Sequence, residues 1–334
     1  MASNGFEVLR DAYLSWAQLA REQYQAGVEA ARDTPPAYAC VDEVIACGMG
    51  GSGIVGDYLA KLSDAYGGVP VSTIRSTVPP RRAGRRTLVL GVSFSGKTVE
   101  TIRCVESAAD AGSLVAVVSG AGPLYERAEA RGWPAVRVPQ GPAARSMFAA
   151  LLYAAIGFLK GLGLLSIPYA EIESSFTALA DAGVEDEAIR VASSLKDASL
   201  VLVVTGWELA PLSLRAVQEF AENSKKPGIP VYAPEALHNF IEGLDRLSTI
   251  GGVRALVIDW NGYSARPLFE HLAARVSERV GATRLEVRRA GVIHALAWAT
   301  LVVGLASIHV ARLEGVNPLE TPFIKEARSV AERM

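Results

Sequence analysis

Two glycine-rich turns with the character of phosphate loops follow one another along this 334-residue chain. The first turn, residues 47–53, has the sequence CGMGGSG and follows the apolar run 44–46. The second turn, residues 91–98, has the sequence GVSFSGKT and follows the apolar run 88–90. Each pattern predicts a strand, a tight turn and a helix start, which points free backbone N–H groups and the positive end of the helix dipole at an anion. Two such turns predict one phosphorylated ligand that is held from two sides.

The first turn matches the glycine fingerprint of dinucleotide-binding proteins, G-x-G-x-x-G, through Gly48, Gly50 and Gly53. That fingerprint also requires an acidic residue about 20 positions further on to hold the ribose. Here the next predicted strand, residues 71–74, ends at Arg75, which argues against NAD. An arginine at this point can accept the extra phosphate of NADP, so a dinucleotide site remains an alternative.

The second turn matches the P-loop of nucleoside triphosphatases, G-x-x-x-x-G-K-[ST], and a Walker-B-like run, ALVID, occurs at residues 255–259. The interior of the turn argues against that function, because Ser93, Ser95 and Thr98 place three hydroxyls where they can converge on one phosphate. A P-loop relies instead on backbone N–H groups, one lysine and Mg²⁺. Three neutral donors suit a phosphate monoester bound without a metal. A triphosphatase remains the second alternative.

Composition sets the class of protein and its environment. A chain of this length with 50% apolar residues can form about two domains, each with a buried core. The net charge of −2 gives no electrostatic reason to expect nucleic acid or an anionic membrane as a partner. The three cysteines, at positions 40, 47 and 104, have neither disulfide-framework nor zinc-site spacing, which favours a reducing cytoplasm. The first residues lack the apolar segment of a signal peptide.

One stretch is long and apolar enough to cross a bilayer. Residues 291–311 contain no Asp, Glu, Lys or Arg. The stretch follows an α/β pattern typical of soluble proteins and carries small and hydroxyl residues, so we expect a helix buried in a core or a dimer interface. His294 and His309, which lie in it, are expected to be core residues and not ligands.

Apolar runs alternate with helical patterns along the chain. Residues 6–32 predict an amphipathic helix, in which Phe6, Leu9, Tyr13, Trp16 and Leu19 fall at helical spacing. The strands predicted next are residues 41–47, 69–74, 87–92, 114–119 and 135–138. A helical stretch at 145–164 follows, and the strand pattern then resumes at residues 200–206, 231–233, 248–250, 255–258 and 285–287.

This alternation predicts parallel sheets with helices on both faces, whose ligands bind outside the carboxyl ends of the strands. The second half has the pattern of the first without its hydroxyl-rich turn. We therefore predict an N-terminal helical segment at 1–36, a domain with the phosphate pocket at 37–165, and a degenerate repeat at 166–334. If the first repeat holds the phosphate, the second is expected to supply the chemistry.

Two polar segments of the second half carry candidate acid–base residues. The helix after residue 207 is predicted to have an apolar stripe of Leu214, Val217 and Ala221 and to end in the sequence ENSK at residues 222–225. Glu222 then lies at the negative end of the helix dipole, where a carboxylate is a stronger base. Shortly afterwards the sequence PEALHN, residues 234–239, contains His238. Taken alone, each residue also fits a solvated surface position.

The combination of segments resembles a known family. A Gly-Gly-Ser turn followed one βα unit later by Ser-x-Ser-Gly-x-Thr resembles the sugar isomerase (SIS) domain, whose ligands are phosphosugars. With the ENSK and PExxHN segments behind it, about nine-tenths of the chain resembles the archaeal-type bifunctional phosphoglucose/phosphomannose isomerases of the phosphoglucose isomerase superfamily. The resemblance implies an α/β fold of two SIS-type doubly wound parallel-sheet subdomains, each an αβα sandwich.

The same resemblance implies roles for individual residues. It makes Glu222 the base that moves a proton between C1 and C2, His238 the ring-opening residue, and Arg145 the cation that balances the developing oxyanion. The last helix should supply another cation, for which Lys325 is favoured and Arg328 is the alternative. Phosphate binding is assigned to the two turns, through Gly50, Gly51, Ser52, Ser93, Ser95 and Thr98.

The implied reaction is the aldose–ketose isomerisation of glucose 6-phosphate and mannose 6-phosphate to fructose 6-phosphate, through an enediol(ate). One carboxylate can both remove and return the proton, so the reaction needs no cofactor and no metal. The resemblance further implies a homodimer in which the histidine reaches the partner subunit's site. A non-catalytic SIS phosphosugar sensor is the alternative of another class, since it would keep the hydroxyl-rich turn but would not need Glu222 and His238 together.

Overall fold

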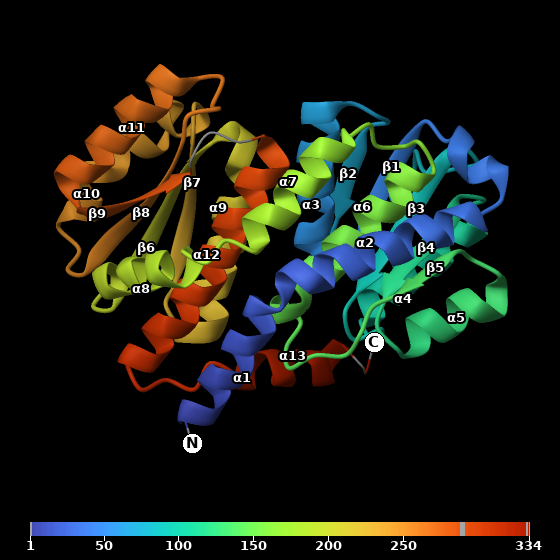
Figure 1. The fold of residues 1–334 in the computed structure, drawn as a ribbon, viewed down its shortest axis with the longest axis horizontal. Coiled ribbons are helices and arrows are strands. Elements are labelled where there is room, and N and C mark those ends of the chain that lie inside the picture. Colours follow the sequence, from blue (N-terminus) through green and yellow to red (C-terminus); the bar gives the residue numbers. More distant parts are fainter. Residues whose placement is uncertain (1, 288–290, 332, 334) are drawn as a thin grey trace. The chain divides into compact units, whose positions relative to one another are not determined.

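Two separate parallel sheets form the framework of the protein in the computed structural model, which describes residues 2–287, 291–331 and 333 (Figure 1). The first sheet has the spatial order β2-β1-β3-β4-β5. Its strands are β1 (Glu43–Cys47), β2 (Val71–Ile74), β3 (Thr87–Ser93), β4 (Leu114–Ser119) and β5 (Ala135–Arg137). Strand β3 is buried along its whole length, as expected for an apolar strand that helices cover on both faces. All five predicted strands of this half are confirmed.

Helices cover both faces of the first sheet. One face carries α3 (Gly50–Tyr66) and α6 (Phe148–Gly161), and α2 (Trp16–Arg32) packs on α6. The other face carries α4 (Val99–Asp110) and α5 (Pro123–Arg131). Glycines allow α2 and α6 to approach very closely, since a Cβ built on Gly157 would lie 2.1 Å from the carbonyl oxygen of Tyr24. The sheet and its helices thus make an αβα sandwich.

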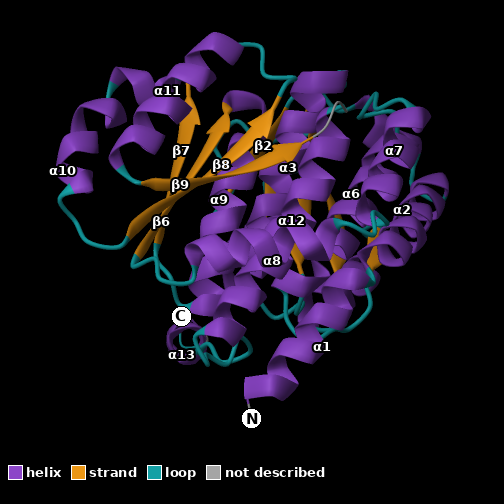
Figure 2. Cartoon of the chain, turned by 60° about the vertical axis from the view of Figure 1, so that its left-hand side comes forward, coloured by secondary structure: helices purple, strands orange, loops and turns teal. Residues whose placement is uncertain are grey.

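The second sheet repeats the topology of the first. Its strands are β6 (Leu200–Gly206), β7 (Gly228–Ala233), β8 (Val253–Trp260) and β9 (Gly281–Val287), all parallel, in the order β7-β6-β8-β9. This order matches β2-β1-β3-β4 strand for strand, which confirms the predicted internal repeat. Helices α8 (Val184–Leu195), α9 (Ala210–Glu219) and α12 (Val292–Leu313) cover one face. Helix α11 (Arg266–Arg279) covers the other face beside α10 (Leu244–Ser248), as Figure 2 shows.

The strand predicted at residues 248–250 is wrong. Helix α10 ends at Ser248, and the chain then turns through Gly252, whose φ is +79°. Ile250 is 52% exposed, so this short run has no apolar surface to cover. A single exposed isoleucine before two glycines therefore forms a turn and not a sheet strand.

Helix α12 is long and apolar enough to span a membrane by length and composition, but 83% of its most apolar window is buried inside the protein. It packs against α1 (Ala2–Leu14), α8 and α9. The prediction of a buried helix is confirmed. His309 is buried in it, and His294 exchanges a hydrogen bond of 2.8 Å with the hydroxyl of Ser174 on α7 (Tyr169–Leu179). Both histidines are therefore parts of the packed structure.

The chain divides into two compact units whose limits differ from the predicted domain boundaries. One unit contains residues 1–14 and 170–321, and the other contains residues 15–169 and 322–334. The helix predicted at residues 6–32 is accordingly two helices, α1 and α2, separated at Ser15. The two helices share one amphipathic pattern, because both Tyr13 at the end of α1 and Trp16 at the start of α2 are buried. Tyr13 belongs to the unit with residues 170–321, and Trp16 belongs to the other unit. Helix α13 (Pro322–Ala331) is counted with the unit that contains the first sheet.

Candidate active site

The two glycine-rich turns lie next to each other at the carboxyl edge of the first sheet. They follow β1 and β3, which are neighbours in the sheet. Strand β2 lies on the other side of β1, and β4 lies on the other side of β3, so the strand order reverses between β1 and β3. This is the topological switch point, where open α/β sheets bind their ligands. The turns contact each other, since the amide N–H of Phe94 donates to the hydroxyl of Ser52 over 3.2 Å. The sequence prediction of two converging turns is confirmed as geometry.

The glycines of these turns permit the close approach. Gly50, the first residue of α3, has φ of +50°, and Gly96 has φ of +64°. A Cβ on Gly48 would lie 2.9 Å from the carbonyl oxygen of Val92 in the other turn. A residue with a side chain would therefore separate the two turns.

Two hydroxyls in the turns accept a backbone hydrogen bond, which leaves their hydrogens to donate. Ser52 accepts from Phe94 N, and Ser95 accepts from Lys97 N over 3.2 Å. The hydroxyl of Thr98 lies 3.0 Å from the fully buried hydroxyl of Ser93, and either oxygen can be the donor. Ser95 and Thr98 are half-exposed and precede α4. Ser93 thus stands behind Thr98, and the other hydroxyls can face an anion.

Arg145 occupies a buried position in the same unit. It begins the short 3-10 helix η2 (Arg145–Met147) and is 5% exposed. Ser146 holds this segment in place, because its carbonyl oxygen accepts from the indole of Trp16 over 2.6 Å and its hydroxyl donates to Ala143 O over 2.9 Å. A surface location at the start of a helix, the ordinary explanation of this arginine, does not hold.

The structure removes the supports for a P-loop. Lys97 is exposed. Asp259, the acid of the Walker-B-like run, lies in β8 and therefore belongs to the second sheet, whereas the turn follows β3 of the first. Its two carboxylate oxygens accept from Arg266 over 2.6 Å and from Arg284 over 2.7 Å. An aspartate held in this way is engaged in structural ion pairs and cannot act as a Mg²⁺ ligand without breaking them.

Cys47, the last residue of β1, is buried immediately before the first turn. Its hydrogen bond with Cys104, together with burial, raises the pKa of the thiol well above its usual range. It therefore remains a neutral thiol and part of the apolar core beneath the turns. Among the residues that the structure describes, no group of three or more His, Cys, Asp and Glu residues could hold a metal ion.

Glu222 lies in an unusual turn. The α-helix α9 ends at Glu219 and continues as a π-helical turn, η4 (Phe220–Ser224), that closes at Lys225 with φ of +61°. Single π turns inside helices are rare and occur often at functional sites. Glu222 itself is half-buried, while Asn223 and Ser224 on its C-terminal side are buried. The predicted apolar stripe is partly wrong, because Ala221 is exposed.

His238 lies at the other end of the same strand. It closes η5 (Glu235–His238), directly after the carboxyl end of β7, and its side chain is exposed. Glu222 precedes the amino end of β7, near the start of β6, where Lys226 Nζ donates to Ala198 O. The six residues of β7 span about 20 Å. One unit therefore keeps Glu222 and His238 at opposite edges of its sheet.

The two cations considered on the last helix, Lys325 and Arg328, are both exposed on α13. Every residue from Pro322 to Val330 is exposed, including Phe323 at 82%. The structure thus brings together the hydroxyls of the two turns and places Arg145 in the same unit. It leaves the choice between Lys325 and Arg328 as predicted.

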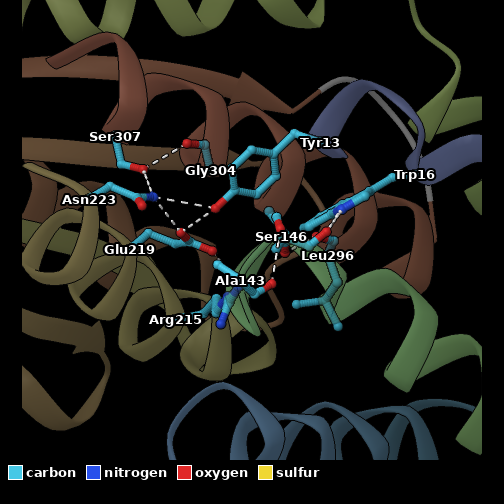
Figure 3. A network of polar contacts seen from close by, with 11 residues as sticks. Tyr13, Trp16, Ala143, Ser146, Arg215, Glu219, Asn223, Leu296, Gly304 and Ser307 are labelled. Atoms are coloured by element: carbon cyan, nitrogen blue, oxygen red, sulfur yellow. Dashed lines mark hydrogen bonds and ion pairs between the residues drawn. The ribbon is translucent and has the colours of Figure 1, made fainter. Parts of the chain in front are cut away.

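Sequence patterns missed a buried polar network beside Glu222. Figure 3 shows Tyr13, Arg215, Glu219, Asn223 and Ser307 in contact inside one unit. Arg215, Glu219 and Asn223 follow one another at intervals of four residues, so they share one helix face. An Arg–Glu pair at this spacing normally indicates a solvated surface pair, which is why the local pattern did not point to the core. The one sequence feature that could have indicated a polar network is Asn223, a third polar residue at the same spacing of four.

Comparisons with known proteins agree with this architecture. Residues 184–330 match the family model described as the bacterial phospho-glucose isomerase C-terminal SIS domain. The chain is 32% identical, over 98% of its length and 99% of the relative's, to a bifunctional phosphoglucose/phosphomannose isomerase of Aeropyrum pernix. Over 62% of its length and 65% of the relative's it is 30% identical to a D-glucosamine-6-phosphate 4-epimerase of Sulfolobus acidocaldarius.

Solved structures show the same fold at low sequence identity. A hypothetical protein of Thermus thermophilus superposes with a TM-score of 0.75 at 16% identity, covering 99% of this chain and 94% of that one. A protein of Clostridium difficile described as a "putative phosphosugar isomerase" superposes with a TM-score of 0.75 at 14% identity, covering 94% of this chain and 95% of that one. The predicted fold class, two doubly wound parallel-sheet sandwiches, is confirmed.

Proposed function

Because the chain belongs to the bifunctional phosphoglucose/phosphomannose isomerase family, we propose that it interconverts glucose 6-phosphate and mannose 6-phosphate with fructose 6-phosphate. The observation that carries the proposal is the pair of turns at the switch point of the first sheet. Ser52, Ser95 and Thr98 there offer neutral donors to a phosphate monoester, in a setting without the charged apparatus of a triphosphatase. Such an enzyme would serve glycolysis and gluconeogenesis in the cytoplasm.

Glu222 acts as the base in the proposed reaction. Its carboxylate takes the proton from C2 of the open-chain aldose, and the electrons of that C–H bond form the C1–C2 double bond of an enediol(ate). The carbonyl electrons of C1 pass to O1, which takes the proton of the O2 hydroxyl, and return of the carbon-bound proton from Glu222 to C1 leaves the carbonyl at C2 of the ketose. The other nearby glutamate, Glu219, is 1% exposed and accepts from Tyr13 and Asn223, which supports Glu222 as the residue that meets substrate.

Positive charge is required where the oxyanion develops on the substrate. Arg145 is assigned this role, and its burial supports the assignment, because a guanidinium held in a low-dielectric site stabilises a developing charge more strongly than one in water. Lys325 is assigned as the cation from the last helix, with Arg328 as the alternative. His238 assists opening of the sugar ring. Mannose 6-phosphate, which differs at C2, shares the base if the C2–C3 bond rotates within the site.

The topology of β7 supports a site built from two subunits. Glu222 and His238 lie at opposite edges of one sheet, about 20 Å apart along the strand, so one substrate cannot meet both residues of the same unit. A homodimer in which His238 serves the partner's Glu222 removes this difficulty. His238 and the apolar Phe323 on α13 are exposed in the single chain. Residues that a partner subunit covers in a dimer are exposed in this way when one chain is viewed alone.

A coupled assay tests the proposal. Purified protein is given fructose 6-phosphate in excess EDTA, and formation of glucose 6-phosphate and mannose 6-phosphate is followed. Turnover under these conditions is the expected result. Saturable binding of fructose 6-phosphate without turnover would identify a phosphosugar sensor, and Mg²⁺-dependent ATP hydrolysis would identify a triphosphatase. A parallel arm with glucosamine 6-phosphate tests the activity named for the Sulfolobus relative.

A further inference from the structure

A buried polar network lies in the core of the unit that carries Glu222 (Figure 3). The carboxylate of Glu219 accepts hydrogen bonds from Tyr13 Oη over 2.6 Å, from Asn223 Nδ2 over 2.9 Å and from Arg215 Nη2. Asn223 Nδ2 also donates to Ser307 Oγ over 2.8 Å, and Ser307 Oγ donates to Gly304 O over 2.7 Å. The network therefore ties α1, α9 and α12 to the π turn.

The orientation of Asn223 follows from the chemistry of its neighbours. Glu219 as a carboxylate can only accept, so the amide nitrogen of Asn223, which carries two hydrogens, must face it. Its two shortest contacts, to Ser307 and Glu219, use both hydrogens. Tyr13 lies 3.4 Å from the same nitrogen and directs its own hydrogen to Glu219. These contacts fix the orientation of the Asn223 amide.

Space around the network is closed as well. A Cβ on Gly304 would lie 2.6 Å from Cε1 of Tyr13, so the tyrosine ring rests directly on the backbone of α12. Tyr13, Arg215 and Asn223 are all fully buried. Tyr13 on α1 therefore fixes the carboxylate of Glu219 through a hydrogen bond. Glu219 in turn fixes the amide of Asn223, the residue that follows Glu222.

Stability alone does not account for such a network. A buried ion pair contributes little net stability, because desolvation of both charges offsets their attraction, and apolar residues of similar volume serve as well. What a buried network of hydrogen bonds provides is one fixed arrangement of the segments that it joins. The segment fixed here is the π turn, whose geometry departs from the α-helix before it and which carries Glu222 at its centre.

We propose that Tyr13, Glu219 and Asn223 are positioning residues that hold the π turn and thereby aim the carboxylate of Glu222 at the substrate carbon. The inference rests on the proposed function and assigns the first 14 residues of the chain a part in catalysis through Tyr13. None of the three touches substrate. The turns of the first sheet bind the phosphate, so loss of the network slows proton transfer without lowering the affinity for the phosphate group.

The test removes one hydroxyl at a time and keeps the packing. Tyr13→Phe deletes only the phenol oxygen, and Ser307→Ala deletes the other anchor of Asn223. The matched control is Tyr38→Phe, since Tyr38 is also buried and donates to a backbone oxygen, Val115 O, over 3.1 Å in the other unit. Thermal midpoint, kcat, KM for fructose 6-phosphate and exchange of the transferred proton with solvent deuterium are measured for each protein.

Tyr13→Phe should lower kcat and the exchange rate by about 10-fold to 100-fold, the range for a reacting group displaced by up to about 1 Å, with KM within about twofold of wild type. Ser307→Ala should show the same pattern, more weakly. Tyr38→Phe should show a similar decrease in thermal midpoint and keep wild-type kcat.

Equal kcat in Tyr13→Phe and Tyr38→Phe would overturn the positioning role while leaving the proposed function intact. A rise in KM with unchanged kcat in Tyr13→Phe would also overturn it, because the network would then serve binding. Absence of isomerisation by the wild-type protein would overturn the proposed function and this inference together.

Discussion

Removal of the hydroxyls at positions 95 and 98 should weaken phosphate binding far more than removal of the charge at position 97. Ser95→Ala together with Thr98→Ala deletes two half-exposed hydroxyls of the second turn. A hydrogen bond to a charged group contributes about 1.5–3 kcal/mol, so the pair contributes about 3–6 kcal/mol. Since about 1.4 kcal/mol corresponds to a tenfold change in affinity, KM should rise at least about 100-fold.

Lys97→Ala is the matched control within the same turn. Its side chain is exposed, and an exposed ion pair contributes about 0–1 kcal/mol, which corresponds to a change in KM of about fivefold at most. Steady-state isomerisation over a range of fructose 6-phosphate, with thermal midpoints to confirm folding, separates the two variants. A larger KM change in Lys97→Ala than in the double variant would refute the reasoning, as would Mg²⁺-dependent ATP hydrolysis that disappears in Lys97→Ala.

Three further outcomes are expected. Glu222→Gln should abolish C1/C2 proton exchange with solvent deuterium while still binding a phosphorylated sugar acid, because the amide keeps the shape but cannot accept a proton; substantial exchange would reassign the base. Inactive Glu222→Gln and His238→Ala subunits refolded together should regain about a quarter of wild-type activity if each site uses both chains, whereas heterodimers without activity would disprove the shared site. Burial lowers the pKa of His309 despite the attraction of Glu185, so the unfolded chain binds this proton first and stability should fall as pH drops from neutral through about 6.5. Thermal midpoints between pH 8 and pH 5 should fall less in His309→Gln, and parallel curves would exclude His309 as the titrating group.

The strand pattern and the glycine turns could be predicted from the sequence because their signals are local. Apolar runs of strand length before glycine-rich turns locate β1 and β3, and parallel strands then bring both turns to one edge. The repeat in the second half was visible for the same reason. The short run at 248–250 failed because β-propensity without a surface to cover does not make a strand.

The candidate site was only partly accessible. The resemblance assigned Glu222 and His238, and a strand is predicted between them at residues 231–233, but only the structure showed that β7 runs from Gly228 to Ala233 and separates them within one unit. Arg145 could equally have been a surface residue until packing showed it buried. The roles of these residues in catalysis stay predictions, which the mutants above test.

By itself, the sequence determined the α/β class, the parallel sheets and the position of the phosphate turns, because each depends on residues close together along the chain. Only the tertiary structure decided that Tyr13, Glu219, Asn223 and Ser307 meet, since they come from helices up to about 300 residues apart in sequence. A pairing of buried polar groups depends on which helix faces pack together, and no local pattern records that choice. The same packing buries Arg215 and Glu219, whose spacing is typical of a solvated surface pair, in the core of the unit that carries Glu222.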